Sequence, residues 1–182
     1  MSRQGGFTLT ELLATAAIAL VLGAVAVPSF RGVLDGIALR GATDELFSAV
    51  QFTRAQAIAR NARVLLAPAG EGGDWAKGWA VFVDADGDRR PGEGDEILLL
   101  RGPLARGISA SASFSSQQSP PYLAYNGGGR ACAATNSMVA RFGSLTLQQG
   151  EAVRRIKISM LGRARVCNPA HDRTCGGDSG VP

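Results

Sequence analysis

The chain begins with one long apolar segment that limits what it can fold into. Residues 7–27 are 21 consecutive residues in which Glu11 carries the only charge. At about 1.5 Å per residue, a helix of this length matches the roughly 30 Å hydrocarbon core of a bilayer. A secretory signal peptide instead has a shorter apolar core and a cleavage site after that core. We therefore expect residues 7–28 to form a transmembrane helix that stays in the mature protein.

A leader of six residues precedes this segment and ends in Gly6. The motif GFTLTE at residues 6–11 resembles the processing site of type IV pilins and type II secretion pseudopilins. The resemblance implies that a prepilin peptidase removes residues 1–6 and methylates the new N-terminus, Phe7. It also implies that Glu11 pairs with the N-terminal amine of a neighbouring subunit. Such pairing would offset the free-energy cost of a carboxylate in hydrocarbon.

A second helical pattern covers residues 29–62, where apolar residues recur at three- and four-residue spacing among charged ones. Its apolar members are Val33, Ile37, Leu46, Phe47, Val50, Ala57 and Ile58. We expect an amphipathic helix that continues the membrane helix and buries this stripe under a sheet. The stretch at residues 46–64 resembles the corresponding helix of the GspH/FimT group of minor pilins and pseudopilins.

Nine short strand candidates follow, separated by connections rich in Gly, Pro and Ser. They lie at residues 64–66, 79–83, 97–100, 108–114, 122–125, 138–142, 144–147, 153–159 and 163–166. A helix followed by antiparallel strands indicates the α+β class. The resemblance implies the type IV pilin-like fold, a long N-terminal helix packed on antiparallel β-sheet. Residues 29–167 would then form a periplasmic globular domain, and residues 168–182 a flexible C-terminal tail.

The three cysteines, Cys132, Cys167 and Cys175, lie in the last third of the chain, and the only histidine is His171. Without CxxC spacing or histidine partners they do not form a pattern typical of a metal site. We therefore expect neither a metal nor another cofactor. In an exported domain, one disulfide and one remaining thiol are expected. The pair Cys132–Cys167 would tie the last strand to the body of the domain and is preferred; Cys167–Cys175, closing a small loop, is the alternative.

An acidic stretch at residues 84–96 carries Asp84, Asp86 and Asp88 at alternate positions. Oxygen ligands spaced in this way can converge on Ca²⁺. The EF-hand pattern nevertheless fails, because Arg89 stands where that pattern requires a glycine. We interpret the stretch as the solvated tip of a hairpin between the strands at residues 79–83 and 97–100.

The sequence offers no recognisable catalytic constellation. Its single histidine lies in the expected tail, and no cysteine–histidine pair or triad is evident. The glycine run at residues 127–129 lacks the Lys-Ser/Thr ending of a nucleotide-binding loop. We expect no enzymatic activity.

Positive charge is concentrated near the C-terminus, where residues 130–182 contain eight basic and three acidic residues. In an extended segment Arg163 and Arg165 project from the same side, and Arg155 and Lys157 alternate with apolar residues just upstream. The sequence GRAR at residues 162–165 resembles the Gly-Arg-x-Arg motif of FimT-type minor pilins. The resemblance implies binding of double-stranded DNA through phosphate contacts that do not read the base sequence.

Two functional hypotheses follow. In the first, the protein is a minor pilin that incorporates into a type IV pilus and binds extracellular DNA for uptake in natural transformation. In the alternative, it is a GspH-like minor pseudopilin, a structural tip component of a type II secretion system. Both imply a single-pass protein of the inner membrane with a periplasmic C-terminal domain. Both also imply prepilin peptidase and other pilins or pseudopilins as partners, with double-stranded DNA added in the first.

Overall fold

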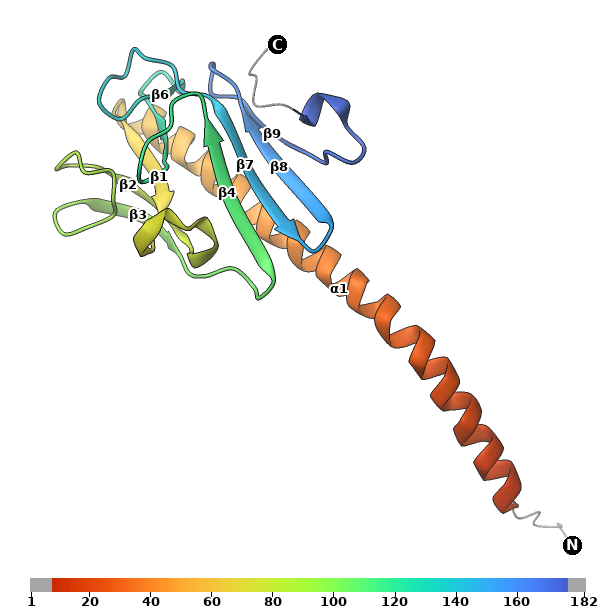
Figure 1. Cartoon of the computed structure of the whole chain (residues 1–182). Helices are drawn as coiled ribbons and strands as arrows, with labels where there is room; N and C mark the ends of the chain where they lie inside the picture. Colours follow the sequence, from red (N-terminus) through yellow and green to blue (C-terminus); the bar gives the residue numbers. More distant parts are fainter. Residues whose placement is uncertain (1–7, 177–182) are drawn as a thin grey trace, which may run out of the picture. The chain divides into compact units, whose positions relative to one another are not determined.

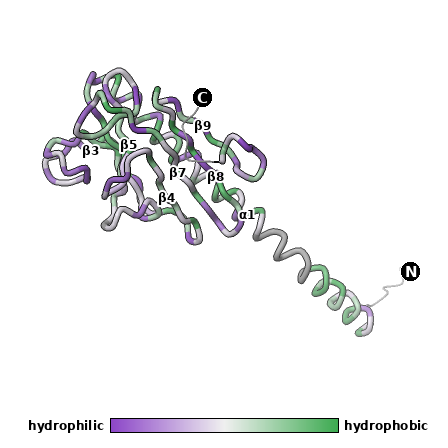
Figure 2. Tube along the Cα trace, turned by 45° about the horizontal axis from the view of Figure 1, so that its top comes forward, coloured by the Kyte–Doolittle hydropathy of each residue, from purple (hydrophilic) through white to green (hydrophobic). Residues whose placement is uncertain are grey.

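The computed structural model describes residues 8–176, and for residues 23–31 and 71 it describes the backbone without the side chains. The chain divides into two units, Met1–Ile37 and Ala38–Pro182. One helix of 52 residues, α1 (Leu9–Arg60), contributes to both units. Its first turns are coloured as hydrophobic in Figure 2.

Among the described residues, no helix is both long enough and apolar enough to cross a membrane. The transmembrane helix expected over residues 7–28 is therefore not confirmed. Phe7 and the side chains of residues 23–28 lie outside the described part of the chain.

In the second unit, α1 buries one stripe of small and apolar side chains against the sheets. The stripe consists of Leu39, Ala42, Leu46, Ala49, Val50 and Ala57, which recur at spacings typical of one helix face. Two threonines on the same face are also buried. Their hydroxyl groups donate hydrogen bonds to helix carbonyls four residues earlier, Thr43 to Leu39 and Thr53 to Ala49, both at 2.7 Å.

The structure corrects parts of the predicted helix pattern. Val33, Ile37 and Ile58 are exposed, although they were expected in the buried stripe. The helix also ends at Arg60, because Asn61 adopts a left-handed backbone conformation with φ of 47°. The amide of Ala62 then donates to the carbonyl of Ala57, as in a Schellman motif.

Nine strands form two antiparallel sheets in the described part of the chain, which confirms the α+β class (Figure 1). The five-stranded sheet has the order β3-β2-β1-β5-β6 and the four-stranded sheet the order β4-β7-β8-β9. The strand bounds are β1 (Val64–Pro68), β2 (Trp79–Val83), β3 (Glu96–Arg101), β4 (Ile108–Phe114), β5 (Leu123–Tyr125), β6 (Ala131–Cys132), β7 (Gly143–Gln149), β8 (Ala152–Ile158) and β9 (Ala164–Cys167).

The strand expected at residues 138–142 is wrong, and the short strand β6 was not predicted. Met138 instead lies in a turn that begins at Asn136, whose side chain accepts from the Met138 amide and whose carbonyl accepts from the Val139 amide. Only Ala140 pairs, in an isolated bridge to Cys132.

One core lies between α1 and the two sheets. It takes Val64 and Leu66 from β1, and Leu145 and Ile156 from the four-stranded sheet. Alternate residues of the five-stranded sheet point to its other face, where Leu65, Phe82, Ala124 and Cys132 belong to a second, smaller cluster that also contains Tyr122, just before β5. On the four-stranded sheet, Arg155 and Lys157 alternate with the buried Ile156 and Ile158 and therefore point to the face away from this core.

Candidate nucleic-acid interface

The β8–β9 hairpin carries the basic residues that the sequence singled out. Its turn closes at Gly162, whose φ of 79° favours glycine. A β-carbon at Gly162 would lie 2.2 Å from the carbonyl oxygen of Gly129, so no side chain fits. The Tyr125 hydroxyl donates to the Gly162 carbonyl at 3.2 Å and anchors the turn to the core.

The register of the hairpin brings three of the predicted residues onto one face. Lys157 lies directly opposite Arg165, and Arg155 lies opposite Cys167. Arg163 precedes β9 by one residue, two positions before Arg165, so it is expected on the same side. Like charges that lie directly opposite each other repel. The pair Lys157 and Arg165 therefore requires hydrogen-bond acceptors nearby.

Those acceptors come from the C-terminal loop, by which we mean residues 168–175. The carbonyl oxygen of Thr174 accepts from both Lys157 Nζ at 3.1 Å and Arg165 Nη2 at 3.0 Å. The carbonyl oxygen of Cys175 accepts from Arg155 Nη1 at 2.9 Å. These residues belong to the short helix η3 (Arg173–Cys175), which lies beside β9 in Figure 1.

Asp172 completes this set of contacts with an ion pair to Arg165 at 2.9 Å. Its carboxylate also accepts from the hydroxyl and the amide of Thr174, at 2.6 Å and 2.8 Å, which caps η3. The hydrogen bond from the Thr174 hydroxyl and then that from Arg165 hold the pKa of Asp172 below its ordinary value. Asp172 is therefore ionised at neutral pH, as the ion pair requires.

The preferred disulfide, Cys132–Cys167, is wrong: the structure joins Cys167 to Cys175 and leaves Cys132 as a buried thiol. The physical reason is topological. Cys132 lies on β6 at an edge of the five-stranded sheet, whereas Cys167 ends β9 at an edge of the other sheet. The disulfide closes the C-terminal loop, so residues 168–176 form a hydrogen-bonded structure where a flexible tail was expected. Residues 177–182 lie outside the described part.

Arg163 differs from the other basic residues of the hairpin. It is exposed, and in the described part of the chain its guanidinium group forms no hydrogen bond or ion pair. Arg141, another basic residue of the C-terminal region, is 1% exposed and cannot contribute to a surface. Sequence reasoning missed the loop acceptors Asp172 and Thr174. Their Asp-x-Thr spacing just before Cys175 was the available signal for a local turn.

The acidic stretch forms the predicted hairpin tip between β2 and β3. Ligand atoms of Asp84, Asp86 and Asp88 all lie within 4.8 Å of one another. One of these carboxylate oxygens already accepts hydrogen bonds within the turn, because the backbone amides of Gly87 and Arg89 both donate to Asp84 Oδ1. The Arg89 guanidinium group donates instead to the side-chain oxygen of Gln118.

At the start of α1, Glu11 forms a capping box with Thr8. Its carboxylate accepts from the Thr8 amide at 3.0 Å and the Thr8 hydroxyl at 2.9 Å. The Glu11 amide donates in return to the Thr8 hydroxyl at 3.3 Å. The predicted processing residues Gly6 and Phe7 lie outside the described residues.

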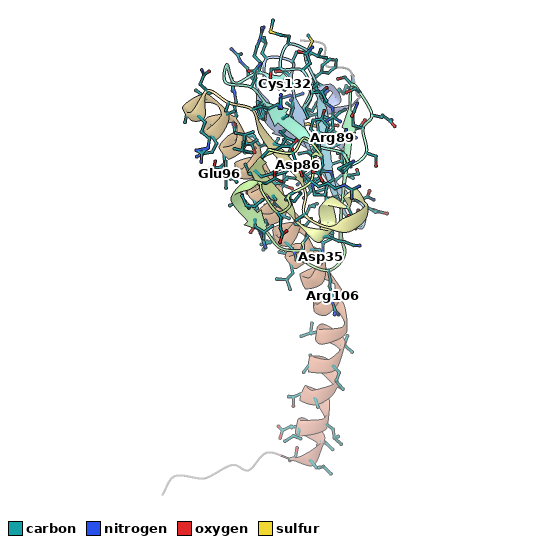
Figure 3. All side chains as sticks on the ribbon, turned by 90° about the vertical axis from the view of Figure 1, so that its left-hand side faces the viewer. Asp35, Asp86, Arg89, Glu96, Arg106 and Cys132 are labelled. Atoms are coloured by element: carbon teal, nitrogen blue, oxygen red, sulfur yellow. A yellow bond between two sulfur atoms is a disulfide. The ribbon has the colours of Figure 1, made fainter. Side chains whose placement is uncertain are left out.

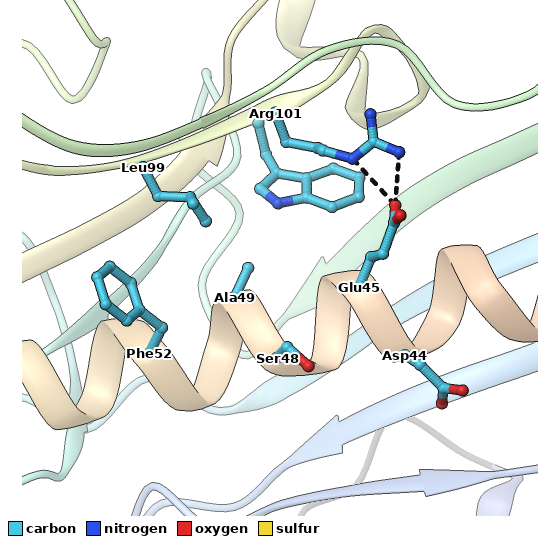
Figure 4. A pocket seen from close by; sticks show the side chains of 8 residues that line it. Asp44, Glu45, Ser48, Ala49, Phe52, Leu99 and Arg101 are labelled. Atoms are coloured by element: carbon cyan, nitrogen blue, oxygen red, sulfur yellow. Dashed lines mark hydrogen bonds and ion pairs between the residues drawn. The ribbon is translucent and has the colours of Figure 1, made fainter.

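An open groove of about 650 Å³ lies between α1 and strands β2 and β3 (Figure 4). Ala49, Phe52, Trp79 and Leu99 contribute to its apolar lining. At one end of the groove, Arg101 Nη2 pairs with Glu45 at 2.7 Å. Asp44, Glu45 and Ser48 of α1 complete the lining, and the Glu45 carboxylate is engaged by Arg101.

The chain is similar to known protein families and to solved structures of the same architecture. Residues 42–162 match the profile of a family described as Type II transport protein GspH, and residues 1–27 match that of the prokaryotic N-terminal methylation motif. Two crystal structures of the type IV minor pilin FimU from Pseudomonas aeruginosa (strain PAO1) are similar, each with 20% identity and a TM-score of 0.55. The match covers 72% of this chain and 90% and 94% of the two solved chains.

No curated protein sequence matches the chain. The likeness to FimU shows a shared fold, and the family profile covers most of the chain beyond the N-terminal motif. The chain therefore belongs to the GspH family of type IV pilin-like minor pilins and pseudopilins.

Proposed function

We propose that this protein is a minor type IV pilin that binds extracellular double-stranded DNA and contributes to its uptake in natural transformation. The observation that carries the proposal is the gathering of Arg155, Lys157, Arg163 and Arg165 on the β8–β9 hairpin. Guanidinium and ammonium groups on an extended scaffold suit phosphate contacts, which bind without reading base sequence. No enzymatic activity is included in this proposal.

The proposal includes the processing and storage expected of the family. A prepilin peptidase would remove residues 1–6 and methylate Phe7, and residues 7–28 would hold the subunit in the inner membrane with residues 29–167 in the periplasm. Glu11 would pair with the amine of a neighbouring pilin during assembly. The match of residues 1–27 to the N-terminal methylation motif supports this route.

The alternative function is a GspH-like minor pseudopilin at the tip of a type II secretion pseudopilus. The description of the matching family favours it. A second observation does so as well, because Arg155, Lys157 and Arg165 already have hydrogen-bond acceptors within the chain. In this alternative the basic hairpin is a structural element with no nucleic-acid role.

Binding of a fluorescent 30-base-pair duplex to the full-length chain in detergent, measured by anisotropy at several salt concentrations, tests the proposal. The double variant Arg163→Ala with Arg165→Ala should bind more weakly. Its dependence of log K on log salt should be shallower by about 2, since each phosphate contact contributes about 0.9. Changing the base sequence of the duplex should leave both proteins' affinities unaltered.

The matched control is Arg90→Ala with Arg106→Ala, which removes the same charge from two exposed arginines elsewhere. It should retain the parent's slope. If both double variants lost the same amount of DNA affinity, the effect would be explained by net charge and not by the hairpin. An absence of binding by the parent at low salt would favour the secretion alternative.

A further inference from the structure

The contacts of the C-terminal loop resemble those of a bound polyanion. Three oxygens of the loop, the carbonyls of Thr174 and Cys175 and the carboxylate of Asp172, accept hydrogen bonds from basic side chains of the hairpin. A phosphodiester backbone would offer the same kind of oxygen acceptors to the same donors. The loop therefore competes with a nucleic acid for these N–H groups.

The loop is held in place at both ends. Cys167 ends β9, and the disulfide fixes Cys175, which is completely buried, beside it. Tethering keeps the loop oxygens at a high effective concentration near Arg155, Lys157 and Arg165. A short disulfide-closed loop also has little conformational entropy to gain by opening.

From these contacts we propose that the C-terminal loop is an intramolecular cover of the polyanion site, competing with DNA for three of its four basic residues. This inference rests on the proposed DNA-binding function and adds its regulation. In the closed form the Arg165 side chain is 49% exposed but its guanidinium group is held by Asp172 and Thr174, whereas Arg163 does not bond to the loop and can make a first phosphate contact. Full engagement requires the loop to leave Arg155, Lys157 and Arg165.

The charges of the hairpin fit this role. Lys157 and Arg165 face each other across the strands and repel, and the Thr174 carbonyl relieves that repulsion in the closed form. In the open form the same two cations would be left without these acceptors. A phosphate group would then bind them more strongly than it binds either charge alone.

The test compares the full-length parent with the double variant Cys167→Ser with Cys175→Ser, which opens the loop without changing charge. Arginine modification by phenylglyoxal, followed by mass spectrometry, reports on the cover directly. Arg165 should react several times faster in the variant, whereas Arg163 should react equally in both and serves as the internal control. If phenylglyoxal modified Arg165 at the same rate in the two proteins, the proposal that the loop covers Arg165 would be wrong.

DNA affinity is the second readout, using the same 30-base-pair duplex. The open variant should bind about tenfold more tightly than the parent at the same salt concentration, because the competing loop contacts are gone. If Arg165 is unmasked but the affinity is unchanged, the loop does not regulate binding although the protein binds DNA. If neither protein binds DNA while Arg165 is unmasked, the DNA-binding function itself is wrong.

Asp172→Asn provides a variant that keeps the disulfide. It removes the ion pair to Arg165 while retaining the carbonyls of Thr174 and Cys175, so affinity should rise by about twofold to threefold. Glu151→Gln is the matched control, because it makes the same change of charge at an exposed position in the β7–β8 turn. Equal gains in both variants would contradict the cover.

Discussion

At the scale of single residues, Arg141 is the only charged side chain that is buried among the described residues. It is 1% exposed, and its guanidinium group lies 3.9 Å from the ring centre of Tyr122 and 4.6 Å from that of Phe114. It donates to the carbonyl oxygens of Ser116 and Tyr122. Burial lowers the pKa of Arg141 below its ordinary value, but an arginine remains charged at neutral pH. Arg141 thus fastens together the two ends of the loop at residues 115–122, which connects β4 to β5.

Arg141→Met should lower the free energy of unfolding by about 3 kcal/mol, because the Ser116 and Tyr122 carbonyls lose a charged donor inside the protein. Urea unfolding followed by the fluorescence of the buried Trp75 and Trp79 measures it. Arg106→Met is the control, since Arg106 is exposed (Figure 3), and should change stability by less than about 0.5 kcal/mol. If the two substitutions lowered the free energy of unfolding by similar amounts, the hydrogen bonds of Arg141 would not stabilise this loop.

The environment of Asp84 leads us to expect that the free energy of unfolding depends on pH. Burial, opposed by hydrogen bonds from the amides of Arg89 and Gly87, raises the pKa of Asp84 above its ordinary value, with a further rise from the charge of Asp95. The folded state therefore holds this proton more tightly than the unfolded state does. Stability should fall as pH rises from the ordinary aspartate pKa of about 3.9 through the raised value.

Asp84→Asn should remove this part of the pH dependence and raise the melting temperature at pH 7, because an amide oxygen can still accept both hydrogen bonds. Melting curves between pH 3.5 and 7 measure the effect. Asp88→Asn, at an exposed position of the same turn, should leave the dependence intact. A parallel shift in both variants would trace the effect to the net charge of the turn.

At the scale of structural elements, the β8–β9 turn is the most constrained connection of the basic face. Gly162→Ala should lower the free energy of unfolding by about 3 kcal/mol, since its β-carbon would overlap the Gly129 carbonyl in addition to the strained φ. Gly150→Ala is the matched control, because Gly150 also has a positive φ but open space around it. It should cost only about 1 kcal/mol. Equal values from urea unfolding would contradict the steric argument.

The same elements show what could be predicted from the sequence. Alternation of Ile156 and Ile158 with Arg155 and Lys157 is a local pattern, so β8 was predicted to within one residue. The strand β6 has two residues, too few for a pattern to be visible. Its place is decided by its pairing with β5.

The candidate site was predictable only in part, for the same reason. The four basic residues were visible because two-residue spacing puts side chains on one side of a strand. The loop that covers three of them was not, because its contacts join residues 172–175 to side chains 7 to 20 positions earlier. Which cysteine pairs with Cys167 likewise depends on where the two sheets place β6 and β9.

At the scale of the whole molecule, the open question is how Glu11 acts when subunits assemble. In the isolated chain its carboxylate is engaged by Thr8 in the capping box. Assembly as expected from the N-terminal motif requires a charge that can attract a neighbouring amine. A capping role needs only a hydrogen-bond acceptor. The two roles can therefore be separated by substitutions that remove one and keep the other.

Glu11→Gln keeps an acceptor for the Thr8 amide but loses the charge, and Thr8→Ala weakens the cap but keeps the carboxylate. If charge pairing drives assembly, Glu11→Gln should be as absent from sheared surface fibres as Glu11→Ala, whereas Thr8→Ala should be incorporated. Immunoblots of fibre and cell fractions from the native host, with N-terminal sequencing to confirm that all variants are processed after Gly6, measure this. Normal incorporation of Glu11→Gln would leave Glu11 with capping alone, and the pairing of its charge with a neighbouring subunit would have to be abandoned.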